Sequence, residues 1–130
     1  MKSKSQIYSE IVFNKVNQLI NNENDDALLK KYKSLCKRAG GLLRTFGLIQ
    51  FLTFLAAKGS KQEEKHHLFL LEQIREELKE QSILDSGNKN VFLSKVQGLE
   101  LPEYMMTTAE TLKFLQWHKR ISDILIQGNA

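Results

Sequence analysis

Several residue types are scarce in this sequence of 130 residues, and each scarcity narrows the class of protein. One cysteine, Cys36, excludes an internal disulfide and fits a reducing cell interior. One proline, seven glycines and few valines, beside abundant leucine, lysine and glutamate, favour an all-α fold. No apolar signal region follows the N-terminus, and the most apolar stretch, residues 45–57, is too short and too polar for a membrane span. The sequence therefore predicts one helical domain, residues 1–130, in the cytoplasm.

Negative charge is absent from a long interval, because no Asp or Glu occurs between residues 27 and 60. The interval carries seven basic residues: Lys30, Lys31, Lys33, Lys37, Arg38, Arg44 and Lys58. Residues 1–60 hold ten Lys and Arg against four Asp and Glu, whereas residues 61–130 hold nine against eleven. The net charge of +4 favours anionic partners. The uneven distribution also suits head-to-tail stacking of copies of the chain.

Apolar residues recur at helical spacing and predict a bundle of about six helices. The expected helices cover about residues 5–20, 25–39, 42–58, 61–81, 90–97 and 102–126. Gly40-Gly41 is expected to break or cap the second helix, and Ser60 with Glu63 has the spacing of a capping box for the fourth. The third helix is apolar on nearly every face, so we expect it at the centre of the bundle, covered on all sides.

Candidates for catalysis or metal binding are weak. Cys36 lies on an apolar helix face, which favours a core thiol over a nucleophile. His66 and His67 are adjacent, so their side chains should point about 100° apart and cannot share a metal as an i, i+4 pair would. His118 neighbours an apolar stripe, which favours packing over RNA stacking or acid–base work. No Gly-rich phosphate loop or zinc-ligand spacing occurs. We therefore expect no catalytic residue, no metal and no cofactor.

The glutamates of the fourth helix form an expected acidic outer face, either solvated or in contact with another protein. Its members are Glu63, Glu64, Glu72, Glu76, Glu77 and Glu80.

Two rows of basic residues are better candidates for binding. Lys30, Lys33 and Lys37 recur at i, i+3, i+7 on one helix, and Lys113, Gln116 and Arg120 recur in the same way on the last helix. Such rows can contact phosphates without reading sequence, although a solvated face that keeps a helix soluble has the same pattern. Trp117 falls on the side of Phe114, Ile121 and Ile124 and is expected in the core. The predicted RNA-binding residues are Lys30, Lys33, Lys37, Arg38, Arg44, Lys113 and Arg120.

Two segments resemble signatures of the small subunit of type III-B CRISPR effectors, the Cmr complex. The first is residues 37–55, KRAGGLLRTFGLIQFLTFL, in which Arg44, Gly47, Leu48, Gln50, Phe54 and Leu55 match. The second is residues 104–112, YMMTTAETL, followed by residues 115–120, LQWHKR. The chain departs from the family pattern at Gly40-Gly41 and at His118. The resemblance covers nearly the whole chain, including its size and the order of its helices.

The resemblance implies a non-catalytic subunit in antiviral defence that stacks with copies of itself and with other Cmr subunits. It also implies that a basic face lies along target RNA paired to guide RNA. Two other interpretations stay open: a helical RNA- or protein-binding adaptor, or the small subunit of a related type III-A effector. A small enzyme using Cys36, His66 or His67 is a further alternative.

Overall fold

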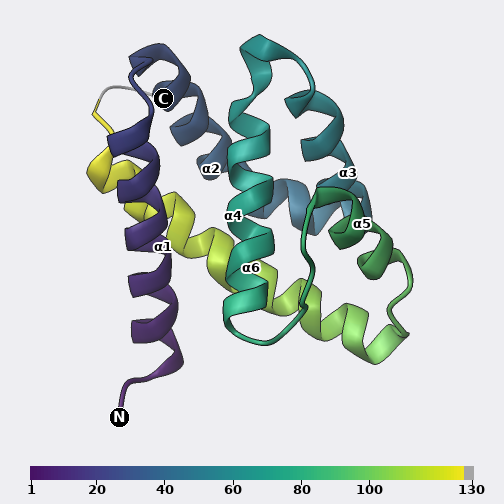
Figure 1. Ribbon diagram of the computed structural model, residues 1–130. Helices are drawn as coiled ribbons and strands as arrows, with labels where there is room; N and C mark the ends of the chain where they lie inside the picture. Colours follow the sequence, from purple (N-terminus) through teal and green to yellow (C-terminus); the bar gives the residue numbers. More distant parts are fainter. Residues whose placement is uncertain (128–130) are drawn as a thin grey trace.

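The computed structural model describes residues 1–127, and all regular structure in this range is helical (Figure 1). The helices are α1 (Lys4–Asn22), α2 (Asp26–Phe46), α3 (Leu48–Gly59), the short 3-10 helix η1 (Gln62–Glu64), α4 (His66–Glu80), α5 (Lys89–Gln97) and α6 (Leu101–Leu125). The predicted all-α bundle of six α-helices is confirmed for these residues. None of the helices described is both long and apolar enough to cross a bilayer.

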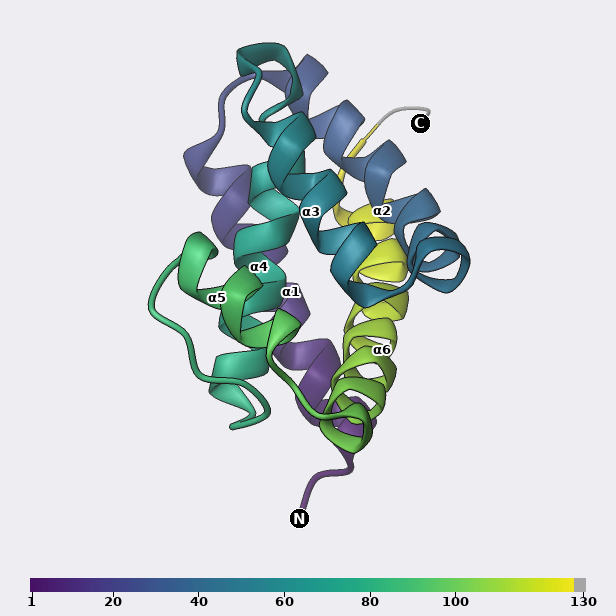
Figure 2. The same cartoon turned by 90° about the vertical axis from the view of Figure 1, so that its right-hand side faces the viewer.

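The helix at the centre of the bundle is α4, which packs against each of the other five α-helices. Figure 1 shows α1 beside α4, with the long helix α6 crossing both obliquely. The side view in Figure 2 shows α5 at the edge of the bundle, where it contacts α3 and α4. Helix α3 buries Leu48, Phe51 and Leu52 but exposes Gln50 and Lys58. The expectation that α3 is covered on every side was therefore too strong.

Helix α2 runs through Gly40-Gly41 without a break, contrary to the prediction. A glycine inside a helix costs only about 1 kcal/mol relative to alanine, and the buried stripe that includes Cys36, Ala39 and Leu43 continues past both glycines. Packing therefore outweighs the local preference of the two glycines. The helix ends instead at Gly47, whose φ of +82° lies in the left-handed region that favours glycine.

The capping box predicted at Ser60 and Glu63 does not form. The Ser60 hydroxyl donates to the Ala57 carbonyl at 2.8 Å, and the chain makes the turn of η1 before α4 begins. A capping box does form at the start of α1, where Ser3 accepts from the Gln6 amide at 3.2 Å and Gln6 accepts from the Ser3 amide at 2.7 Å. Gly59 is buried, and a Cβ there would collide with the side chain of Leu68 on α4. The close approach of the end of α3 to α4 thus requires glycine at position 59.

Helix α1 is joined to α6 by an aromatic stack and a carboxylate. The rings of Tyr8 and Phe114 stack with centroids 4.0 Å apart. The Tyr8 hydroxyl and the Lys4 ammonium donate to Glu110 Oε1 at 2.7 and 2.8 Å. Burial opposes ionisation of Glu110, but the hydrogen bonds from Lys113, Lys4 and Tyr8 outweigh burial and lower the pKa of Glu110 to about 2. The carboxylate is therefore ionised at neutral pH, and it anchors α1 on α6.

A buried polar network joins α2, α4 and α6 at the centre of the bundle. Glu77 Oε2 on α4 lies 2.5 Å from His118 Nε2 on α6, and both side chains are fully buried. On the other side of the ring, His118 Nδ1 lies 3.2 Å from the Tyr32 hydroxyl, which donates to Gln73 Oε1 at 2.6 Å. The prediction that Glu77 belongs to an exposed acidic face is wrong, because Glu77 points inward while Glu76 and Glu80 are exposed. The packing role expected of His118 is confirmed by its burial.

The hydrogen bonds identify His118 as an imidazolium. Tyr32 has one proton and gives it to Gln73, so its oxygen accepts from Nδ1–H, while the Glu77 carboxylate accepts from Nε2–H. Burial by itself would lower the pKa of His118, but the Glu77 carboxylate outweighs burial and raises it to about 10. Burial raises the pKa of Glu77, and the imidazolium opposes that rise. At neutral pH the two groups therefore form a buried ion pair.

We expect Glu77→Gln to lower the free energy of unfolding by about 3–5 kcal/mol, because it removes one member of a buried pair. Denaturant unfolding followed by circular dichroism measures this loss. The matched control is Glu76→Gln, since Glu76 is exposed and lies 3.8 Å from Lys15; its expected loss is at most about 1 kcal/mol. Equal stabilities of the two variants would contradict the assigned pair.

The same pair predicts how stability depends on pH. The folded-state pKa of His118, about 10, lies above the unfolded value of about 6.5. Its contribution is therefore complete below about pH 6.5 and is lost as pH rises toward 10. The reference is the double variant Glu77→Gln/His118→Gln, which carries neither titrating group. We expect the stability difference between the native chain and this variant to shrink between about pH 6.5 and 10; a constant difference would mean that His118 is neutral.

Candidate nucleic-acid interface

Helices α2 and α6 pack side by side, and a hollow of about 230 Å³ lies between them on the surface. We call it the α2–α6 hollow. It is lined by Cys36, Lys37, Gly40, Gly41 and Arg44 from α2 and by Leu115, Gln116, Lys119 and Arg120 from α6. Both walls are long helices with buried inner faces, so the hollow has a rigid frame.

Four of the lining side chains are cations, namely Lys37, Arg44, Lys119 and Arg120. All are exposed, and within residues 1–127 none forms an ion pair with a carboxylate. Their charge is therefore available to an anion from solvent. Cations gathered around a concave surface raise the local concentration of a polyanion and bind its phosphates.

Gly40 and Gly41 contribute backbone without side chains to the lining of the hollow. A Cβ on Gly41 would meet nothing within 4 Å, and one on Gly40 would make only an ordinary contact, 3.7 Å from Leu112 Cδ1. Packing inside the chain would therefore tolerate alanine at either position. Each glycine lowers the stability of the helix by roughly 0.5–1 kcal/mol relative to alanine. The absence of side chains lets a ligand approach the helix backbone closely.

The structure brings Lys37, Arg44 and Arg120 together, three of the seven residues predicted to bind RNA. Lys30 and Arg38 are exposed on α2 but line different hollows. Lys30 and Lys37 lie on nearly the same side of α2, but they are about two turns, roughly 10 Å, apart along the helix, whereas Arg38 is turned by about 100° from Lys37.

Lys33 does not lie on the exposed face at all. Its side chain is buried, and its ammonium donates to the Ile126 carbonyl at 3.0 Å and lies 3.7 Å from Asp123 Oδ1. It thus ties α2 to the end of α6. Sequence alone could not separate it from Lys30 and Lys37, since the difference comes from what packs above it.

Lys113 is exposed but is neutralised, because its ammonium lies 2.8 Å from Glu110 Oε2. Lys119 takes its place as the second α6 cation of the hollow, and the sequence reasoning missed it. The signal was present, since Lys119 follows Gln116 by three residues. Trp117 is half-buried and packs against the core as expected, with the Arg120 guanidinium 5.5 Å from its ring centroid. Ile124, expected beside it, is 71% exposed.

A second hollow, of about 250 Å³, lies on another side of α2, against α3 and the start of α4. We call it the histidine hollow. Its lining residues are Lys31, Ser34, Arg38, Phe54, Lys58, Glu64, His66 and His67. Burial lowers the pKa of His66 to about 4 and also lowers the pKa of His67, so both imidazoles are neutral at pH 7.

The two imidazoles lie closer together than their sequence positions suggested. Their ring centroids are 4.2 Å apart, and one ligand atom from each ring lies within 4.8 Å of the other and of a Glu64 oxygen. The prediction that these adjacent histidines point too far apart to share a metal ion is therefore wrong. Both rings are buried in the first turn of α4, where they lie against each other, and Glu64, the last residue of η1, precedes His66 by two residues.

Cys36 and His118, the other candidates for nucleophilic or acid–base catalysis, do not join His66 and His67 in the histidine hollow. Cys36 is fully buried on α2, as predicted for a core thiol. His118 is held by Glu77 and Tyr32 inside the core.

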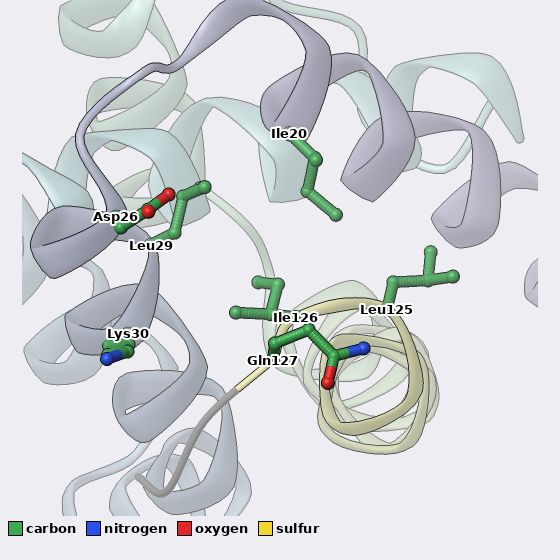
Figure 3. Close-up of a pocket in the computed structure, with 7 residues that line it drawn as sticks. All are labelled: Ile20, Asp26, Leu29, Lys30, Leu125, Ile126 and Gln127. Carbon is green, nitrogen blue, oxygen red and sulfur yellow. The ribbon is translucent and has the colours of Figure 1, made fainter.

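A third hollow, of about 410 Å³, lies where the ends of α1 and α6 meet the start of α2. Figure 3 shows Ile20, Leu29, Leu125 and Ile126 around it, with Asp26 and Lys30 at the side. We call it the end hollow. Its walls are mainly apolar, which distinguishes it from the α2–α6 hollow.

Comparison with known proteins gives a matching family model and solved structures of similar fold. Residues 4–125 match the family model described as CRISPR-associated protein (Cas_Cmr5). The fold is similar to the X-ray crystal structure of a CRISPR-associated Cmr5 family protein from Thermus thermophilus, with a TM-score of 0.77 and 24% identity. That alignment covers 98% of this chain and 100% of the other. A search of curated proteins finds no match.

Proposed function

The chain belongs to the CRISPR-associated Cmr5 family. We propose that it is a small subunit of the type III-B Cmr complex, that it binds the backbone of target RNA, and that it catalyses no reaction. One observation carries the proposal: four exposed cations from two packed helices, none paired with a carboxylate within residues 1–127, line one hollow together with Gly40 and Gly41. Phosphate groups fit this arrangement in charge, and the bare backbone allows close approach.

The lining favours contact with phosphates over contact with bases. Among the described residues that line the α2–α6 hollow, none is aromatic. Trp117, on the neighbouring face of α6, is half-buried and carries the Arg120 guanidinium above its ring. Binding of single-stranded RNA through bases uses aromatic stacking platforms. The subunit would therefore bind independently of sequence, and pairing between guide and target would select the sequence.

The same lining supports a role without catalysis. The described residues around the hollow include no carboxylate and no imidazole that could act as a general acid or base. The one thiol, that of Cys36, is fully buried. A bound phosphate would meet cations and backbone groups, which stabilise its negative charge.

Stacking of copies is the second part of the proposal, and exposed apolar side chains support it. Leu101, Met105 and Met106, near the start of α6, are 68, 62 and 45% exposed. The end hollow lies at the other end of the same helix, which spans much of the molecule (Figure 1). Exposed apolar side chains at one end and an apolar hollow at the other allow a heterologous contact that repeats from copy to copy.

The acidic face of α4 is a poorer candidate for this contact than the sequence suggested. Glu72 pairs with Arg75 at 2.9 Å, and Glu80 pairs with Lys15 at 2.9 Å. With Glu77 buried, little unpaired charge remains there to attract a neighbour. We therefore assign the stacking contact to the apolar ends.

The RNA-binding proposal predicts that Arg44→Gln/Lys119→Gln weakens binding of single-stranded RNA equally for unrelated sequences. Removing one phosphate contact should reduce the slope of log affinity against log salt by about 0.7. Fluorescence anisotropy across a salt series measures both effects on the purified chain, and target retention by the reconstituted complex checks them in context.

The control for this measurement is Lys61→Gln, which removes an exposed cation outside the α2–α6 hollow. Lys33 is unsuitable as a probe, because replacing it would break a buried contact with Ile126. Decreases of the same size in the control and in the double variant would place RNA binding elsewhere. Binding that depends on RNA sequence would contradict a backbone-only role.

The stacking proposal predicts that Met105→Glu reduces the number of copies per reconstituted complex but leaves the melting temperature of the isolated chain unchanged. A charge at an exposed position costs the monomer little, whereas its burial against a neighbour's apolar hollow is costly. Native mass spectrometry gives the stoichiometry. The matched control is Val91→Glu, at a 39% exposed apolar residue on α5.

Cysteine cross-linking tests the direction of the contact. The double variant Met105→Cys/Gln127→Cys should form a ladder of multimers under oxidation in the complex, and each single variant should not. Dimers from Met105→Cys alone would instead indicate a symmetric contact and would rule out head-to-tail stacking.

A further inference from the structure

The histidine hollow contains a cluster of side chains with the composition of a metal site. Glu64, His66 and His67 each offer one ligand atom, and these atoms lie within 4.8 Å of one another. Ligands of a tetrahedral zinc ion are about 3.4 Å apart, given metal–ligand distances near 2.0–2.1 Å. Glu64 is half-buried at the end of η1, and its Oε1 lies 3.8 Å from His67 Nδ1, so the carboxylate lies beside the histidines.

The two imidazoles differ in their hydrogen bonds, and both differences favour ligation. His67 Nδ1 lies 2.8 Å from the Glu64 backbone carbonyl, so Nδ1–H donates and Nε2 carries the lone pair. A carbonyl that fixes the tautomer in this way is a common partner of metal-binding histidines. His66 is 3% exposed, and its buried Nδ1 has no hydrogen-bond partner among the described residues. A buried polar atom without a partner is uncommon, and a bound ligand would satisfy it.

We propose that Glu64, His66 and His67 bind one divalent transition-metal ion, of which Zn²⁺ is the best match, with a fourth position open to solvent. Two imidazole nitrogens and one carboxylate oxygen form a donor set that suits zinc and related ions. The site would tie η1 to the first turn of α4. It is independent of the α2–α6 hollow, and it reverses the expectation from sequence that the chain binds no metal.

Three cations around the hollow affect how tightly this site would bind a metal ion and how that affinity depends on salt. Lys31, Arg38 and Lys58 line it together with the ligands and would repel a bare dication. An anion such as hydroxide or phosphate in the fourth position would offset that repulsion. Metal affinity should therefore rise as salt screens the cations, whereas an anion held by the cations alone would be released by salt.

The experiment uses the full chain without a histidine tag, stripped with chelator and titrated with Co²⁺, whose visible absorption reports tetrahedral ligation. We expect saturation at one equivalent and a higher melting temperature with metal. Glu64→Gln should weaken binding at least about tenfold, since even an outer partner of a metal ligand contributes about 10–100-fold. Glu63→Gln, the matched control at an exposed neighbour, should bind as the native chain does.

Two further measurements keep the proposal falsifiable where a histidine variant fails to fold. Lys58→Gln should tighten Co²⁺ binding by removing a repelling charge, and added potassium nitrate should have the same direction of effect on the native chain. No absorption change at millimolar Co²⁺, or equal affinity of Glu64→Gln and Glu63→Gln, would overturn the site. Weaker binding at high salt would also overturn it. RNA binding by the α2–α6 hollow is unaffected by any of these results.

Discussion

The buried pair of Glu77 and His118 is the contact on which the arrangement of the other helices depends. It joins α4 to α6, and the Tyr32 hydroxyl extends the network to α2. A charged pair without solvent is stable only where its donors find their acceptors, so its hydrogen bonds select one relative placement of the three helices. The α2–α6 hollow lies on the outer side of that placement. Lys37 and Arg44 meet Lys119 and Arg120 there because the packing of α2 on α6, to which this network contributes, holds the two helices side by side.

Helix α2 serves several surfaces at once, because successive residues face different neighbours. One face buries Tyr32, Cys36 and Ala39, and another contributes Lys37 and Arg44 to the α2–α6 hollow. A third contributes Lys31 and Arg38 to the histidine hollow. The basic residues that are close together in the sequence therefore lie on different sides of α2 and belong to distinct surface sites. Lys33 shows the division most clearly, since its charge is used inside the molecule to hold the end of α6.

The glycines show where stability and proposed function diverge. Gly59 is needed for packing, since Leu68 occupies the place of its side chain, and Gly47 is needed for its positive φ. Gly40 and Gly41 meet neither need, yet they lie in the middle of a helix, where alanine would be more stable. Residues that lower the stability of a protein without a structural benefit are common at binding surfaces. Their place in the lining of the α2–α6 hollow is consistent with close approach of RNA.

By itself the sequence determined the helical class, the approximate positions of the helices, the buried role of Cys36 and the excess of positive charge before residue 60. These properties follow from composition and from the period of apolar residues, which act locally. Its two signatures also identified the family, which the match over residues 4–125 confirms. Only the tertiary structure decided which charges are free. Glu77 and Lys33 look like surface residues in sequence, but partners on distant segments bury them. Lys119 joins Lys37, and Glu64 joins the two histidines, because packing between helices, which no local pattern encodes, brings them together.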